Sequence, residues 1–229
     1  MRWTDRLAQI CVCAGVAMVP FTANAATEDD PWEGVNRVIF KFNEKLDTYA
    51  LKPLAQGYQF ITPQFLEDGI HNMYRNIGDV RNLANDVLQA KPHAAGVDTA
   101  RLLMNTTLGV AGFFDLGTKM GLQRNSEDFG QTLGYWGVPS GPYVMLPLLG
   151  PSTVRDAVAI YPDGYAEPYR YMNDIPARNM AIGMDIIDTR ASLLSAEKLI
   201  TGDKYVFIRN AYLQNREFKI KDGQVEDDF

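Results

Sequence analysis

The segment that decides the fold is FGQTLGYWGVPSGPYVMLPLLGPSTV, residues 129–154, which has no Lys, Arg, Asp or Glu in a chain that is 22% charged. Its length and apolar composition would suit a membrane span. Its five glycines and four prolines exclude an unbroken helix. A broken backbone persists at bilayer depth only where protein buries it or where it lines a cavity. Two interpretations stay open: a re-entrant, interfacial or cavity-lining segment, or a buried Pro/Gly-rich loop region of a soluble core.

The amino terminus predicts export. Arg2 and Arg6 precede a mostly apolar stretch over residues 7–22, and Ala23-Asn24-Ala25 fits a small-x-small cleavage site. These are the parts of a secretory signal peptide. We expect residues 1–25 to be removed by cleavage after Ala25.

The two cysteines of the chain, Cys11 and Cys13, both lie inside this predicted signal peptide. The mature chain would then have no cysteine, which excludes disulfides and cysteine metal ligands from it. Lipid attachment at Cys13 would require a small residue before it, but Val12 stands there. Ordinary cleavage is therefore favoured, and lipoprotein processing remains the alternative.

The charge balance excludes some partners. After removal of residues 1–25 the chain has 20 basic and 27 acidic residues. It offers no basic field for nucleic acid and no polybasic patch for anionic lipid. Any membrane contact must therefore be mainly apolar. We expect one domain over 26–223 and an acidic, disordered tail over 224–229.

Several segments show the apolar spacing of amphipathic helices. The first begins at Asp30, which suits an N-cap, with Pro31 at the first helical position and Glu33 three residues after the cap. We expect this helix to end or kink at Lys52-Pro53. Further helices are expected over 63–77, 80–91, 93–108, 153–160, 176–194 and 204–216. Gly78 is expected to interrupt the chain between the first two of these helices.

Strand signals are scarce, so the predicted fold class is mainly α. Residues 143–146 and 218–220 are the candidates for short strands. An amphipathic helix normally packs its apolar face on a protein core. Several such helices beside charge-free, broken segments also fit a membrane interface, as do the Tyr and Trp residues that flank those segments.

Catalytic and metal-binding patterns are mostly missing. The chain has two histidines, His71 and His93, and no His/Cys cluster with zinc-ligand spacing. Ser152 follows Gly150-Pro151 without the second glycine of a nucleophile elbow. A Ser-His-Asp triad stays formally open, but we predict a protein without enzymatic activity, cofactor or metal.

Separated motifs, in order along residues 29–223, resemble the MlaA (VacJ) family of outer-membrane phospholipid-transport proteins. The first is a helix-start motif that contains Asp30, Pro31, Glu33, Asn36 and Arg37, followed by Phe40 and by Phe42-Asn43. The other similar segments are 105–109, 129–134, 141–150, 153–156 and 203–218.

The resemblance implies a ring-like bundle of amphipathic helices seated in the inner leaflet of the outer membrane. It also implies an amphipathic channel that removes misplaced phospholipid from the outer leaflet and passes it to a periplasmic carrier. A trimeric porin is the implied membrane partner, and Phe42-Asn43 the implied neighbourhood of the channel mouth. Family members are typically lipoproteins, and the amino terminus of this chain departs from that pattern.

The segment 141–150 is our candidate for the wall of the lipid passage, because its glycines and prolines impose a fixed non-helical path. The candidate residues are Gly141, Pro142, Tyr143, Leu146 and Pro147, with the Tyr143 hydroxyl at an otherwise apolar wall. Two other functions stay open: a soluble periplasmic lipid carrier with a closed cavity, and an envelope lipid hydrolase that would depend on Ser152, His71 or His93.

Overall fold

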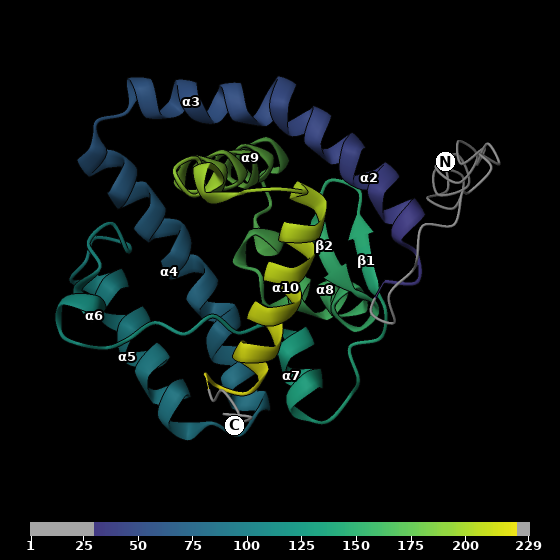
Figure 1. Ribbon diagram of the computed structural model, residues 1–229. Helices are drawn as coiled ribbons and strands as arrows, with labels where there is room; N and C mark the ends of the chain where they lie inside the picture. The colour runs from purple at the N-terminus through teal and green to yellow at the C-terminus, as the bar shows by residue number, and fades with distance from the viewer. Residues whose placement is uncertain (1–29, 224–229) are drawn as a thin grey trace, which may run out of the picture.

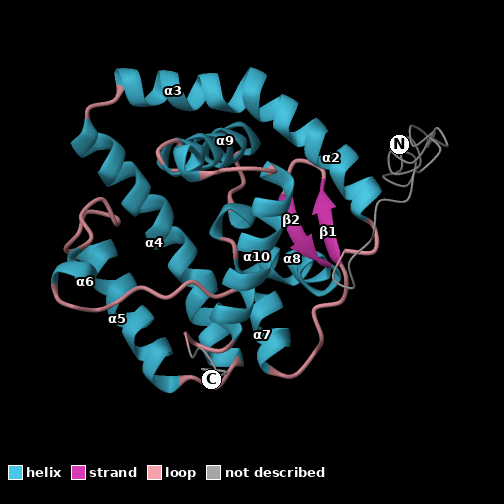
Figure 2. Cartoon of the chain, viewed as in Figure 1, coloured by secondary structure: helices cyan, strands magenta, loops and turns pink. Residues whose placement is uncertain are grey.

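The computed structural model describes residues 30–223, except for the side chains of 198 and 199, and is mainly helical (Figure 2). The predicted signal peptide and acidic tail lie outside these residues. The elements are α2 (Glu33–Leu46), the π-helix η1 (Asp47–Leu51), α3 (Lys52–Ile61), α4 (Gln64–Leu88), α5 (Pro92–Thr107), α6 (Leu116–Lys119), α7 (Phe129–Tyr135), β1 (Tyr143–Leu146), β2 (Gly150–Thr153), α8 (Val154–Ala166), the 3₁₀ helix η2 (Pro168–Tyr171), α9 (Ile175–Ser192), the 3₁₀ helix η3 (Ala196–Leu199) and α10 (Lys204–Ile220).

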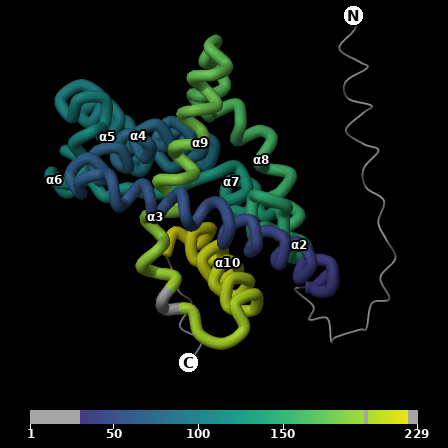
Figure 3. Tube along the Cα trace, turned by 90° about the horizontal axis from the view of Figure 1, so that it is seen from above, coloured from purple at the N-terminus to yellow at the C-terminus, as the bar shows by residue number. Residues whose placement is uncertain are grey.

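The helices follow a ring-like course (Figure 1). α2, η1 and α3 form one long arc, α4 turns away from its end, and α5 runs back beside α4. α9 packs beneath α3, and α10 packs against α7 and β2. In the view from above, the amino-terminal end of α9 projects from one side of the ring and the α9–α10 connection from the other (Figure 3). The predicted mainly α fold is confirmed.

The start of the first helix differs from the prediction. α2 begins at Glu33, its N-cap is Trp32 without a side-chain cap, and Asp30 is fully buried instead of capping. Asn36 Nδ2 donates to Asp30 Oδ1 at 2.8 Å, and the Tyr205 hydroxyl donates to Asp30 Oδ2. The capping interpretation is wrong because long-range donors compete successfully for this carboxylate.

The predicted kink near Pro53 takes the form of the π-helix η1, in which the Lys52 amide donates to the Asp47 carbonyl. Proline has no amide proton, so it leaves a carbonyl one turn earlier without its usual donor. The π-helical turn changes the hydrogen-bond register at this point. The chain thereby continues from α2 into α3 without a break.

Two other sequence-based expectations are wrong. Gly78 does not interrupt a helix, since α4 runs without a break for 25 residues. A glycine inside a helix costs only about 1 kcal/mol relative to alanine, and α4 is held by packing and hydrogen bonds on both sides of it. Residues 218–220 are not a strand but belong to the last turn of α10.

The charge-free segment contains the predicted strand at 143–146. β1 pairs with β2 in an antiparallel hairpin, with Tyr143 opposite Thr153 and Leu146 opposite Gly150. The turn between them exposes Leu148 and Leu149, each 67% accessible. The segment therefore buries one part of itself and exposes another.

The distribution of polarity is inverted relative to an ordinary soluble domain. Within residues 30–223, buried polar and charged residues outnumber buried hydrophobic ones by more than two to one. α4 buries Asn76, Asp79, Asn82 and Asp86, while its Phe65 is 65% exposed. Large exposed apolar patches are rare on soluble monomers and mark contact with protein or membrane. The apolar stripes of the sequence therefore point largely outward.

Ion pairs and hydrogen bonds satisfy much of this polar interior. The Arg216 guanidinium bridges Asp128, the N-cap of α7, and Asp156 in the first turn of α8. Both aspartates have a lowered pKa because the hydrogen bonds and charge of Arg216 outweigh their burial. These charges thus join α7, α8 and α10.

Candidate functional site

Two asparagines of α2 hold the edge of β1. Asn36 Nδ2 donates to the Tyr143 carbonyl at 3.1 Å, and Asn36 Oδ1 accepts from the Met145 amide at 2.8 Å. Two helical turns later, Asn43 Nδ2 donates to the Leu146 carbonyl at 2.9 Å, and its Oδ1 accepts from the Leu148 amide at 2.8 Å. The two side chains lie on one face of α2 and fix the hairpin to it.

Replacing Asn43 with alanine is expected to loosen the hairpin turn without unfolding the protein. The change leaves two backbone groups near the surface without partners, which costs about 1–2 kcal/mol. Hydrogen exchange should become faster at the Leu148 amide. Asn36→Ala, at a buried position, should instead lower the free energy of unfolding by about 2–3 kcal/mol. Unchanged exchange at Leu148 in the Asn43 variant would contradict this role.

An apolar cavity of about 480 Å³ lies beside this hairpin, between α2, the hairpin, the end of α9 and α10. Its lining includes Asn43, so one of the two asparagine clamps borders it. The apolar part of the wall is formed by side chains from distant parts of the sequence: Phe40, Met145, Leu193, Ile200, Phe207 and Ile208.

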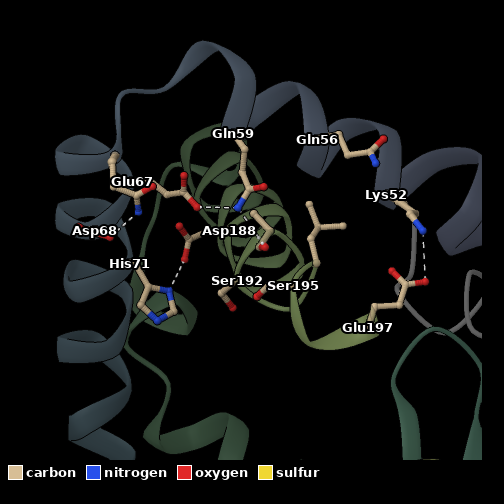
Figure 4. A pocket seen from close by; sticks show the side chains of 13 residues that line it. Lys52, Gln56, Gln59, Glu67, Asp68, His71, Asp188, Ser192, Ser195 and Glu197 are labelled. Atoms are coloured by element: carbon tan, nitrogen blue, oxygen red, sulfur yellow. Dashed lines mark hydrogen bonds and ion pairs between the residues drawn. The ribbon is translucent and has the colours of Figure 1, made fainter. Parts of the chain in front are cut away.

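A larger polar cavity of about 790 Å³ lies on the other side of the end of α9 (Figure 4). His71 Nδ1 lies 2.7 Å from Asp188 Oδ2, and the Tyr58 hydroxyl donates to Asp188 Oδ1 at 3.2 Å. Burial and the Asp188 charge raise the pKa of Tyr58, so this hydroxyl stays protonated. The cavity is lined mostly by polar side chains of α3, α4 and α9.

The two cavities share one boundary, residues 190–197, which we call the partition. Arg190 and Leu193 line the apolar cavity, Ser192 and Ser195 line the polar cavity, and Glu197 lines both. An apolar space and a polar space thus lie on either side of a single short segment.

A charge cluster joins the partition to the surrounding helices. Arg190 donates to Asp47 Oδ1 and Oδ2 at 2.6 and 2.9 Å, and to Glu197 Oε2 at 2.8 Å. Lys52 Nζ lies 3.2 Å from Glu197 Oε1, and Lys204 Nζ lies 3.7 Å from the same oxygen. The hydrogen bond from Arg190, with the one from Lys52, lowers the pKa of Glu197 to about 2. Glu197 is therefore ionised at neutral pH.

The structure distributes the predicted passage residues unevenly. Asn43 lines the apolar cavity, whereas Phe42 is 53% exposed and does not line it. The Leu146 carbonyl accepts from Asn43, and Pro147 lies exposed in the hairpin turn. Tyr143 is fully buried and does not line the apolar cavity, so its hydroxyl does not lie at the otherwise apolar wall where we expected it from the sequence. Its ring packs edge-on against Tyr205 and Tyr212.

Gly141 and Pro142 position the hairpin and do not line the cavity wall. Gly141 has φ +65°, and a Cβ at this position would lie 3.2 Å from Val154 Cβ. The Pro142 carbonyl accepts from the Val154 amide at 3.1 Å. These two residues join the entry of β1 to the start of α8.

The helix-start motif links α2 to α10. Arg37 donates to Glu33 Oε1 at 2.6 Å and lies 2.9 Å from Asp203 Oδ2, while Arg209 donates to Asp30 at 3.1 Å. Pro31 is exposed before α2 begins. The motif therefore joins the start of α2 to the first half of α10 and lies outside both cavities.

The structure does not bring the candidate hydrolase residues together. Ser152 is buried and donates to the Thr153 carbonyl at 3.2 Å. His71 lines the polar cavity, and His93 lines a different cavity with Asp98 and Asn125. In the described part of the chain, no group of three or more His, Cys, Asp or Glu residues has an arrangement that could hold a metal ion.

Sequence reasoning missed most of the cavity residues. Arg190, Leu193, Glu197, Lys204 and Phe207 come from the end of α9, η3 and the start of α10. The partners that they meet lie about 150 residues earlier, in α2, η1 and α3. The sequence signals for the cavity were Asn43, in the predicted channel-mouth neighbourhood, and the charge-free segment, which contributes Met145, Gly150 and Pro151.

The comparisons with known proteins agree with this architecture. The family model for the MlaA lipoprotein matches residues 28–219, which include nearly all of the described chain. The chain belongs to the MlaA family.

Two relatives of this MlaA-family chain carry the name intermembrane phospholipid transport system lipoprotein MlaA. The protein of Escherichia coli K12 is 32% identical over 225 residues, covering 93% of this chain and 88% of the relative. The protein of Haemophilus influenzae is 30% identical over 210 residues, covering 89% and 84%.

A solved structure is also similar to this MlaA-family chain. It concerns the structural basis for maintenance of bacterial outer membrane lipid asymmetry. The two superpose with a TM-score of 0.73 at 33% sequence identity, covering 83% of this chain and 98% of the other. None of the helices within residues 30–223 has both the length and the hydropathy needed to cross a bilayer.

Proposed function

We propose that this protein takes part in intermembrane phospholipid transport and removes misplaced phospholipid from the outer leaflet of the outer membrane. The observation that carries the proposal is the pair of cavities on either side of the partition. A phospholipid has a charged headgroup and apolar chains, and the two spaces offer a matching environment for each. The names of the relatives support the same function.

We also propose that the protein lies at the periplasmic face of the outer membrane, in its inner leaflet. The outward apolar side chains of α2, α3 and α5 support this location, including Val38, Phe60 and Leu103, which are 65%, 90% and 60% exposed. Burial of apolar helix faces at a bilayer surface is favourable in proportion to their area. Its partners are a trimeric porin in the membrane and a periplasmic lipid carrier that receives the phospholipid.

The transport involves no covalent chemistry, so the protein acts as a passage and not as an enzyme. We assign the mouth of the passage to the place where the hairpin meets the apolar cavity. Asn43 lines the cavity there and binds the Leu146 carbonyl, and Pro147 follows in the hairpin turn. Gly141 and Pro142 hold the hairpin in position, and Phe42 faces outward beside it.

A charge in the apolar cavity is expected to block transport. Leu193 and Phe207 line the cavity and are already 52% and 40% exposed, so Leu193→Asp and Phe207→Asp should leave the fold intact. An acyl chain against an ionised carboxylate is disfavoured, and we expect transport to fall at least about tenfold. Complementation of a strain that lacks its own family member, scored as resistance to detergent at matched protein abundance, measures the effect.

Leu193→Met and Phe207→Leu are the matched controls and should complement like the wild type. Ser152→Ala and His93→Ala, which change residues outside both cavities, should also retain transport. If a folded Ser152→Ala or His93→Ala protein lost function while Leu193→Asp kept it, the result would favour the hydrolase. A folded wild-type protein found only in the soluble periplasm would favour the soluble carrier.

A further inference from the structure

We propose that the cavity pair selects phospholipids whose headgroup carries an amine, with the phosphate at Lys204 and Lys52 and the ammonium group in the polar cavity. This inference rests on the proposed function and specifies its ligand.

The polar cavity is acidic. Glu67, Asp68, Asp188 and Glu197 line it, opposed by Lys52 and by His71. Gln59 Nε2 donates to Glu67 Oε1 at 3.0 Å, and Gln64 Nε2 donates to Asp68 Oδ1 at 2.9 Å. These amides orient the two carboxylates without neutralising them. The cavity therefore attracts a cation and repels an anion.

The cations of the charge cluster differ in how firmly they are held. Arg190 makes three short hydrogen bonds to Asp47 and Glu197, which fix it as part of the framework. Lys204 lies 3.5 Å from Glu44 and 3.7 Å from Glu197, beyond ordinary hydrogen-bond distance, and its side chain is 31% exposed. A phosphate oxygen can replace such contacts with shorter, charge-assisted hydrogen bonds.

The positions of these groups match the order of groups in a phospholipid. Lys204 lines the apolar cavity, Lys52 lines the polar cavity, and Glu197 lies between them on the partition. With acyl chains in the apolar cavity, the phosphate lies at the lysines. The group beyond the phosphate then enters the space that contains Glu67 and Asp68.

An amine and a neutral alcohol at that place have different consequences. The ammonium group of an ethanolamine-type headgroup pairs with the carboxylates and leaves the lipid neutral overall. A glycerol-type headgroup puts only neutral hydroxyl groups beside Glu67 and Asp68, so the lipid keeps the net negative charge of its phosphate next to an acidic cavity. The phosphate and the carboxylates of the polar cavity carry like charges and repel each other. This repulsion corresponds to about tenfold weaker binding of the glycerol-type lipid.

The test uses the purified mature chain and vesicles that contain ethanolamine-type and glycerol-type phospholipids in equal amounts with identical acyl chains. Mass spectrometry measures both lipids bound to the re-isolated protein. We expect an excess of the ethanolamine lipid of about five- to tenfold. The double variant Glu67→Gln/Asp68→Asn should bring the ratio of ethanolamine lipid to glycerol lipid close to one. Asp68→Asn alone, at an exposed position, should lower this ratio by a smaller amount.

Lys204→Met should lower the binding of both lipids about tenfold, because it removes the phosphate contact. Glu217→Gln and Lys41→Met are the controls: the Glu217 side chain is 68% exposed, Lys41 is exposed on the same helix as Asn43, and both changes should leave amount and ratio unaltered. Circular dichroism confirms that each variant is folded.

Equal uptake of the two lipids by the wild type, or an unchanged ratio in both acidic-cavity variants, would overturn the inference and leave the proposed transport function intact. A wild-type protein that takes up neither phospholipid would instead contradict the proposed function itself.

Discussion

Replacing Arg101 with methionine is expected to lower the free energy of unfolding by about 3–5 kcal/mol. The Arg101 side chain is 2% exposed, and its Nη2 donates to both carboxylate oxygens of Asp115 at 3.2 Å. Its Nη1 donates to Thr118 Oγ1 at 3.1 Å. Methionine fills much of the volume but leaves the half-buried Asp115 carboxylate without its cation. Urea unfolding in mild detergent at pH 7, followed by circular dichroism, measures the loss.

The pH dependence identifies the origin of this loss. Burial would raise the pKa of Asp115, but hydrogen bonds from Thr118 and Arg101 lower it to about 2. A lowered folded-state pKa contributes stability above the ordinary aspartate range, and this contribution disappears as the pH falls towards 2. The difference between wild type and variant should therefore shrink on acidification.

Two control variants distinguish the effect of breaking the Arg101–Asp115 ion pair from the effect of removing any positive charge. Lys119→Met, at an exposed position of the neighbouring α6, should change stability by less than about 0.5 kcal/mol. Adding Asp115→Asn to the Arg101 variant should recover part of the loss, because the half-buried Asp115 side chain then carries no charge that lacks a partner. A cost below about 1 kcal/mol for Arg101→Met would show that the polar interior is hydrated in solution.

Replacing Asp98 with asparagine is expected to stabilise the protein at pH 8 by about 2–5 kcal/mol. Asp98 is fully buried, and its carboxyl group lies against that of Asp86, with which it shares a hydrogen bond when Asp98 holds a proton. Burial, together with the charges of Asp86 and Asp79, raises the pKa of Asp98 to about 8. Asparagine has nearly the same shape and needs no proton to remain neutral.

The sign of the pH dependence follows from the raised pKa. Below about pH 4 both folded and unfolded chains hold the proton, so Asp98 costs little. Between about pH 4 and 8 the unfolded chain releases the proton while the folded chain keeps it, so stability falls as the pH rises. Asp98→Asn should remove this fall, so its advantage grows with pH and levels off above 8.

Thermal unfolding of wild type and Asp98→Asn across pH 4 to 9 measures this difference, with Glu217→Gln as the exposed control. A variant less stable than the wild type at pH 8 would show that the ionised carboxylate itself is required. If the difference in stability between the two proteins were the same at all pH values, the effect would come from packing and not from proton binding.

Local signals in the sequence predicted local structure well. Lys91-Pro92 separates α4 from α5 as the fixed backbone angle of proline requires, and the residues 143–146 form the predicted strand. Asp30 shows where such signals fail. Its spacing to Glu33 is that of a capping box, but its side chain is bound by Tyr205 and Arg209, about 175 residues away. Competition from distant donors has no signature in the neighbouring residues.

By itself, the sequence determined the helical periodicity, the charge-free broken segment, and the motifs that identify the family. It showed that α4 has a polar and an apolar face, but periodicity does not state which face points inward. The tertiary structure decided this, because Asn82, Asn85 and Asp86 find hydrogen-bond partners in α7, α8 and the loop before α7, in addition to partners within α4. The formation of the two cavities also depends on the tertiary structure. Arg190 and Glu197 acquire their roles only when α2, η1 and α3 pack beside them, and a spacing of about 150 residues carries no information on that contact.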